Sequence, residues 1–134
     1  TALPILVGVN GGTVSNSYAS GTVNGNDFVG GLVGENENTI SNSYSIGNVT
    51  GNAYVGGLVG KNYGTVSNSF WDIETSGQPT SAGGTGKTTA EMKSIATFSG
   101  AGWDITAVAL NQTNPAYIWN IVNGVTYPFL SWEP

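Results

Sequence analysis

The chain has 134 residues, of which 8% are charged, with a formal net charge of −5 and no histidine, arginine or cysteine. This length predicts one domain, and the shortage of basic residues excludes a nucleic-acid-binding surface. The lack of cysteine excludes a disulfide framework and a thiolate metal site, and no apolar run approaches the roughly 18 residues of a membrane-spanning helix. We therefore expect no metal, no cofactor and no insertion into a membrane.

The chain begins with an apolar, extended segment, Thr1–Val9. Pro4 favours a first or edge position in a sheet, because proline cannot donate a ladder hydrogen bond. The chain also begins in the middle of a repeat and without methionine, so we expect a processed protein or a piece of a longer one.

One sequence then recurs at a fixed offset of 26 residues. Thr13-Val-Ser-Asn-Ser-Tyr18 returns as Thr39-Ile-Ser-Asn-Ser-Tyr44, and Val29-Gly-Gly-Leu-Val-Gly34 returns as Val55-Gly-Gly-Leu-Val-Gly60. A fixed period of this size is typical of a solenoid. The three copies begin at Thr13, Thr39 and Thr65, after half of an earlier copy at Leu6-Val-Gly8.

Each copy contains three short extended segments separated by glycines and rich in Val, Ile, Thr and Tyr, which is strand composition. No window within the repeats places apolar residues at helical spacing. One copy cannot bury its own apolar face, but stacked copies give each strand a neighbour on both sides. The period therefore predicts a parallel β-helix with 26-residue coils, spaced about 4.8 Å along the axis.

Stacking places equivalent residues in ladders. The alternation of strand side chains predicts that Thr13, Ser15 and Ser17 face solvent, opposite to Val14 and Tyr18. It also predicts that Asn16 and its equivalents lie inward at a corner, where amides bond to one another and to the turn backbone. The predicted ladders are Val14, Ile40 and Val66; Tyr18, Tyr44 and Phe70; Asn16, Asn42 and Asn68; and Asn10, Asn36 and Asn62.

After Phe70-Trp-Asp72 the period breaks, and Thr75–Gly86 is a loop rich in Gly, Ser, Thr and Pro. Within it Gly83-Gly-Thr-Gly-Lys-Thr88 resembles a phosphate-binding loop, but Ser81 stands where that motif needs its first glycine, and no buried strand precedes it. Thr88-Thr-Ala-Glu91 is instead a capping box, and it predicts one short helix over residues 88–98.

The remaining residues contain three strand-like pieces, at residues 105–110, 117–122 and 125–129, with a turn at Asn123-Gly124. All four tryptophans lie from residue 71 onward. We expect residues 1–72 to form the coils and residues 73–134 to form a mixed cap in the same domain, because the open end of a solenoid must be covered. A competing interpretation is that these aromatic residues form a sugar-binding platform.

The signature Val-Gly-Gly-Leu-Val-Gly-x-Asn, at Val29–Asn36 and Val55–Asn62, resembles the GLUG repeat family, as does the Asn-Ser-Tyr segment. The resemblance covers about residues 6–72. It implies a right-handed β-helix and a setting at the surface of a bacterial or archaeal cell. It implies no catalytic residues, because the repeat of that family has none. The segment from Phe70 to Trp132 also resembles the part that closes such arrays.

Three functions follow from these observations. A non-catalytic structural or adhesive surface module suits the low charge and the Ser/Thr/Asn-rich outer face. A polysaccharide-active enzyme needs two carboxylates facing one bond, and Asp72 with Glu74 is the nearest candidate pair. Ice binding needs a regular Thr-x-Thr face, and each coil supplies one regular threonine.

The sequence supports two further expectations. Asn48-Val-Thr50 and Asn111-Gln-Thr113 are N-glycosylation sequons, which predict Asn48 and Asn111 as the acceptors in a cell that glycosylates its secreted proteins. The N-terminal end of the stack leaves strand edges open. We expect these edges to bind further repeats of a longer chain or a second copy, head to tail, and surface polysaccharide is a further candidate partner.

Overall fold

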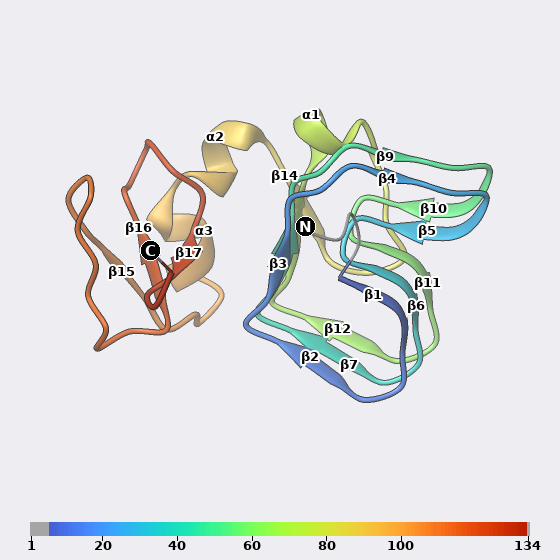
Figure 1. Cartoon of the computed structure of the whole chain (residues 1–134), viewed down its shortest axis with the longest axis horizontal. Coiled ribbons are helices and arrows are strands. Elements are labelled where there is room, and N and C mark those ends of the chain that lie inside the picture. Colours follow the sequence, from blue (N-terminus) through green and yellow to red (C-terminus); the bar gives the residue numbers. More distant parts are fainter. Residues whose placement is uncertain (1–5, 134) are drawn as a thin grey trace. The chain divides into compact units, whose positions relative to one another are not determined.

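The computed structural model describes residues 6–133 and divides the chain into two compact units, Thr1–Thr88 and Thr89–Pro134. Figure 1 shows both units. The first strand of the first unit begins at Val7, inside the predicted extended segment Thr1–Val9. Of that segment, the structure describes Leu6 to Val9. Pro4 lies outside the described residues.

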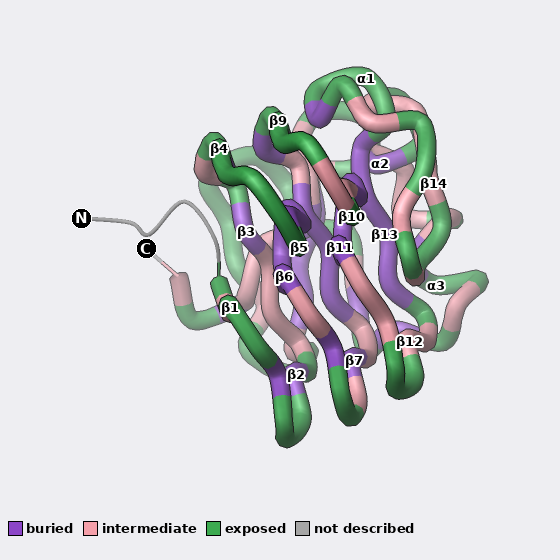
Figure 2. The backbone as a smooth tube through the Cα atoms, turned by 90° about the vertical axis from the view of Figure 1, so that its right-hand side faces the viewer, coloured by how far each residue is buried: buried purple, intermediate pink, exposed green. Residues whose placement is uncertain are grey.

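The first unit is a stack of parallel strands, which confirms the predicted β-helix. Val7 pairs with Val33, and Val33 pairs with Val59, each one repeat further along the chain. Figure 2 shows these strands running side by side, with the buried residues along them in purple. The strands of the repeats are β1 (Val7–Asn10), β2 (Thr13–Ser15), β3 (Tyr18–Ala19), β4 (Val23–Asn24), β5 (Asp27–Gly30), β6 (Val33–Asn36), β7 (Thr39–Ser41), β8 (Tyr44–Ser45), β9 (Val49–Thr50), β10 (Ala53–Gly56), β11 (Val59–Asn62), β12 (Thr65–Ser67) and β13 (Phe70–Asp72).

A complete coil has five short strands, whereas the sequence predicts three longer ones. The Thr-Ile-Ser-Asn-Ser-Tyr segment is divided at Asn42, whose φ of 47° places it in the left-handed region. Asparagine tolerates this conformation better than most residues. The Val-Gly-Gly-Leu-Val-Gly segment is divided between Gly56 and Val59. Each division turns the chain and closes the coil.

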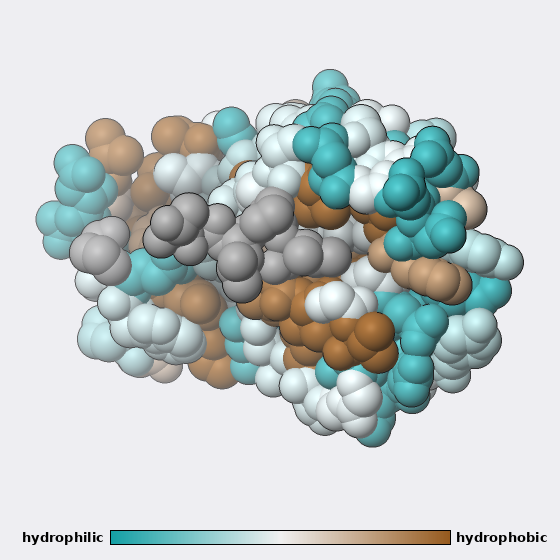
Figure 3. Space-filling model, turned by 45° about the vertical axis from the view of Figure 1, so that its right-hand side comes forward, coloured by the Kyte–Doolittle hydropathy of each residue, from teal (hydrophilic) through white to brown (hydrophobic). Residues whose placement is uncertain are grey.

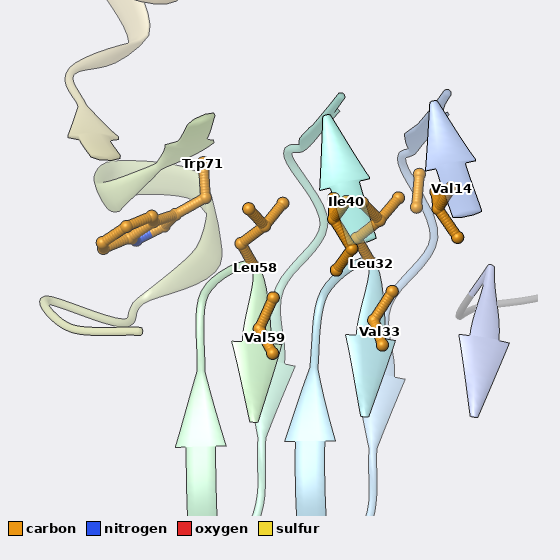
Figure 4. Close-up of a cluster of buried hydrophobic side chains, with 8 residues drawn as sticks. Val14, Leu32, Val33, Ile40, Leu58, Val59 and Trp71 are labelled. Carbon is orange, nitrogen blue, oxygen red and sulfur yellow. The ribbon is translucent and has the colours of Figure 1, made fainter. Parts of the chain in front are cut away.

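The main core lies inside the coils and consists of apolar residues from successive repeats. Leu32 and Leu58 are fully buried, as are the paired valines of β6 and β11. Figure 4 shows how these side chains line up across the stack, with Trp71 at one end. The core comprises Val14, Ala19, Leu32, Val33, Ile40, Leu58, Val59 and Trp71.

Each coil also extends an arm, made of β4 and β5 in one repeat and of β9 and β10 in the next (Figure 1). The arms have their own small core of valines. In each repeat the arm returns to the sheet β1-β6-β11, and its backbone contacts a glycine of that sheet. A Cβ on Gly34 would lie 2.6 Å from the carbonyl oxygen of Phe28, and one on Gly60 would lie 2.6 Å from that of Tyr54. The last glycine of the signature therefore permits this close approach.

Residues 73–88 add a further layer to the stack, so the predicted loop is partly regular. α1 (Ile73–Ser76) follows β13, and β14 (Thr85–Lys87) pairs in parallel with β13. Between them, the Ser81 hydroxyl accepts hydrogen bonds from the backbone N–H groups of Leu58 and Val59, at 3.2 and 2.9 Å. The 26-residue period could not predict this layer, because each residue of β14 pairs with the residue of β13 that lies 15 positions earlier in the sequence.

The second unit packs two short helices against a small mixed sheet. β15 and β16 are parallel, and β16 and β17 are antiparallel. The Phe98 and Trp103 rings lie 4.8 Å apart, as do the Trp103 and Trp119 rings. These three rings are buried with Met92 and Ile121. The elements are α2 (Thr89–Met92), α3 (Ile95–Ser99), β15 (Ile105–Ala107), β16 (Trp119–Ile121) and β17 (Phe129–Leu130).

The prediction of a single helix over residues 88–98 is wrong, because the chain forms two helices separated by Lys93 and Ser94. The predicted Asn123-Gly124 turn lies at this break. The Asn123 side chain accepts a hydrogen bond from Ile95 N–H at 2.9 Å, and Gly124 N–H donates to the Lys93 carbonyl at 2.7 Å. This tertiary contact replaces hydrogen bonds that a continuous helix would make.

Candidate functional site

The predicted Asn10, Asn36 and Asn62 ladder is a chain of amide hydrogen bonds through the stack. Asn10 Nδ2 donates to Asn36 Oδ1, and Asn36 Nδ2 donates to Asn62 Oδ1, both at 2.9 Å. The Asn10 amide also donates to the Thr39 carbonyl at 3.0 Å. Asn36 is fully buried. These amides stabilise the corner between adjacent coils, because buried polar groups need hydrogen-bond partners.

The structure places Asn16, Asn42 and Asn68 at a second corner, with φ values of 47–48°. Their side chains are partly or largely exposed, so this ladder lies at the surface and not inward as predicted. The left-handed residue interrupts the alternation of the strand, and the next residue, a serine, therefore turns inward.

Serines form an inner ladder in place of these asparagines. The prediction that the Ser17 position faces solvent is wrong, since its equivalents Ser43 and Ser69 are buried. The Ser43 hydroxyl accepts from Ser17 N–H at 3.3 Å and donates to the Ser41 carbonyl at 2.8 Å. Ser69 makes the same bonds with Ser43 and Ser67, at 3.2 and 2.9 Å. The serines thus satisfy backbone groups at the corner.

The apolar and aromatic ladders are in register. Val14 pairs with Ile40, and Ile40 pairs with Val66. The Tyr18 and Tyr44 rings are stacked 5.1 Å apart, and Tyr44 pairs with Phe70. These residues pack between coils and offer no chemistry of their own.

Asp72 and Glu74, the carboxylate pair considered for catalysis, do not face a common space. Asp72 is fully buried and caps α1, because its Oδ1 accepts from the N–H groups of Glu74 and Thr75, at 2.9 and 3.1 Å. Glu74 is exposed. The structure therefore gives Asp72 a helix-capping role in place of the catalytic role considered for it.

The sheet β1-β6-β11 and the returning arms carry a group of exposed rings and half-buried charged residues, which we name the aromatic face: Phe28, Tyr54, Glu35, Lys61 and Tyr63. The Phe28 and Tyr54 rings are stacked 5.0 Å apart at an angle of 5°. The Lys61 ammonium lies 4.1 Å from the centre of the Tyr54 ring and 5.4 Å from that of Tyr63. The three rings are 41%, 52% and 66% exposed.

Phe28 and Tyr54 also adopt positive φ angles, of 55° and 53°. A bulky residue is rare in this region, and the conformation costs of the order of 1–3 kcal/mol. Both repeats thus hold an exposed aromatic ring where glycine or asparagine would fit with less strain. The sequence could not indicate this strain, because Asp-Phe-Val and Ala-Tyr-Val have ordinary strand composition.

Two carboxylates interact here, Glu35 within the aromatic face and Glu37 next to it. The Glu37 side chain forms a hydrogen bond with Glu35, and this raises the pKa of Glu35 above its ordinary value of 4.5. Lys61 pairs with Glu35 across β6 and β11 and partly offsets the increase. Both Glu35 and Lys61 lie on strands, in β6 and β11.

The second unit contains an open pocket of ≈ 330 Å³, lined in part by Asn111, Phe129 and Glu133. Glu133 accepts a hydrogen bond from Leu130 N–H at 2.9 Å. Of the tryptophans, only Trp132 is exposed, at 68%, which weakens the predicted aromatic sugar platform in this unit. Both sequon residues, Asn48 and Asn111, are exposed.

Across residues 6–133 no three His, Cys, Asp or Glu side chains gather as a metal site would require. The helices in this range are too short to cross a membrane. Comparison with curated proteins found no match, and neither did comparison with solved structures. The family model of the GLUG motif matches residues 29–50 and 51–70. The chain therefore carries two adjacent GLUG repeats over residues 29–70.

Proposed function

We propose that the chain is a non-catalytic structural and adhesive module of a longer β-solenoid at a cell surface. The observation that carries this proposal is that the repeated polar residues bond to the next coil. Asn36 bonds to both of its neighbouring equivalents, and Ser43 does the same. Residues used in this way maintain a rigid stack and do not act on a substrate.

The N-terminal end of the stack supports the proposal that another coil of the same repeat docks there. Leu6 lies one period before Leu32 and is 41% exposed, whereas Leu32 and Leu58 are fully buried. Figure 3 shows a hydrophobic patch, in brown, amid hydrophilic surface. A coil added at this end would bury Leu6 as Leu32 is buried, and open strand edges favour such addition.

The asparagine ladder has a direction that fits the same partner. Asn36 Oδ1 accepts from Asn10 Nδ2 and from Asn38 N–H, at 2.9 and 3.4 Å. Within residues 6–133, Asn10 Oδ1 accepts only from Gly12 N–H, at 3.1 Å. The Asn10 oxygen could accept the side-chain donor of an asparagine in a preceding coil, as the Asn36 oxygen accepts that of Asn10. That coil belongs either to upstream repeats of the same chain or to a second copy.

The test combines activity and adhesion. The purified chain is incubated with neutral and acidic polysaccharides, and newly formed reducing ends and unsaturated products are measured. In parallel, the chain is displayed on a non-adherent bacterium, and the attached cells are counted. We expect no polysaccharide cleavage and increased attachment. Cleavage of any polysaccharide would contradict the proposal. Attachment equal to that of cells that do not display the chain would contradict it as well.

A further inference from the structure

We propose that the aromatic face is a binding site for a neutral oligosaccharide. The proposal concerns a ligand site on the coils and goes beyond the structural role of the repeats. It rests on three aromatic rings, one ammonium and two carboxylates that share one exposed surface of the first unit.

The rings supply the apolar part of such a site. The buried aromatic rings of the coils, such as Tyr44, pack between successive repeats. Tyr63 differs, because two thirds of its side chain remains exposed. A tyrosine presents an apolar ring face and a hydroxyl group together, and this combination suits the C–H face and the hydroxyl edge of a sugar ring.

The charged groups supply hydrogen-bonding partners. Carboxylates accept hydrogen bonds from neighbouring hydroxyls, and the lysine ammonium donates up to three. Because the Lys61 ammonium reaches both Tyr54 and Tyr63, one short oligosaccharide can contact both rings and this charge. Glu35 lies next to Lys61 in the paired strand and extends the hydrogen-bonding surface.

Charge decides between neutral and acidic glycans. Lys61 is the only cation of the aromatic face, and two carboxylates stand beside it. The whole chain carries a net charge of −5. A uronic-acid polymer would therefore be repelled, whereas hydroxyl groups carry no such penalty. A protein partner is disfavoured because the cores of protein interfaces are depleted of charged residues, and the Lys61 ammonium contacts both the Tyr54 and the Tyr63 ring.

The test is an NMR titration of the isotope-labelled full chain with three neutral probes, cellohexaose, maltohexaose and mannohexaose, and with trigalacturonic acid as the acidic control. We expect at least one neutral probe to shift the aromatic signals of Tyr54 and Tyr63, and trigalacturonic acid to shift neither. Tyr63→Ala is expected to weaken binding at least about tenfold. Tyr54→Gly is expected to do the same without loss of fold, because glycine accepts a positive φ.

Tyr117→Ala is the matched control, since Tyr117 is an exposed tyrosine of the second unit and is expected to leave the affinity unchanged. The proposal is overturned if none of the three neutral probes shifts these signals. It is also overturned if the acidic control binds more tightly, if the shifts centre on Trp132, or if Tyr63→Ala binds like the parent. Tyr63 lies in an exposed turn, so this variant tests the site even if Tyr54→Gly unfolds.

Discussion

Replacement of Leu58 by alanine tests the packing of the coils most sharply. Leu58 is fully buried in the main core, and the backbone of Gly84 lies close against it, because a Cβ on Gly84 would stand 2.6 Å from Leu58 Cδ2. Glycines next to the removed side chain have no atoms that could move into the space. The cavity therefore persists, and the cost of a cavity adds to the lost transfer free energy.

We expect Leu58→Ala to lower the free energy of unfolding by about 3–5 kcal/mol, the upper part of the range for buried leucines. Leu32→Ala, equally buried, is expected to behave similarly. The matched control is Leu6→Ala, at the same position of the repeat but 41% exposed. It opens no enclosed cavity, so we expect a loss of about 1 kcal/mol.

The assay is guanidinium denaturation followed through NMR signals of residues 6–88, because a fluorescence signal would mix Trp71 with the tryptophans of the second unit. The guanidinium concentration at the midpoint of unfolding should fall, with little change in the slope of the unfolding free energy against guanidinium concentration. If Leu58→Ala costs no more than Leu6→Ala, the leucine does not fill the core, and the coils are not packed around it.

Three further predictions concern single residues. Asn36→Ala is expected to lower stability by about 1–3 kcal/mol, because it leaves buried amide partners without bonds; an unchanged denaturation midpoint would contradict the ladder. The raised pKa of Glu35 means that the folded state binds more protons than the unfolded state, so this group's contribution is present below pH 4.5 and is lost as pH rises through the folded pKa. Carboxyl NMR titration should show that pKa returning toward 4.5 in Glu37→Gln, and no movement would exclude the hydrogen bond as its cause. In a secretory host that N-glycosylates, Asn48 and Asn111 are the expected acceptors, and an intact mass equal to the 13.7 kDa of the bare chain would rule out their use.

The repeat predicted the fold of the first unit because each coil makes the same contacts as the next. A 26-residue period places Val14 on Ile40 and Ile40 on Val66, and the structure pairs them in that order. The sequence predicted less well which side chains of a coil point inward. Strand alternation assigns Ser43 to the outside, but the left-handed Asn42 reverses the direction of the residues after it.

The candidate site depended on contacts that a linear pattern does not contain. Tyr54 and Lys61 lie in different strands, and Tyr63 lies in a turn beyond them, so only the fold brings the three together. The sequence indicated a single extended segment at each copy of the signature. It did not indicate that the arm returns against Gly34 and Gly60 and exposes an aromatic ring there.

Cross-linking of engineered cysteines tests the stacked coils most directly, because the natural chain contains no cysteine. Thr13 pairs with Thr39, and Thr39 pairs with Thr65. Adjacent strands lie about 4.8 Å apart, within the Cα separation that a disulfide allows, whereas strands two coils apart lie too far. Under mild oxidation, Thr13→Cys/Thr39→Cys should form an intramolecular disulfide, and Thr13→Cys/Thr65→Cys should remain reduced. The reverse result, or equal cross-linking of both pairs, would contradict a stack with a 26-residue period.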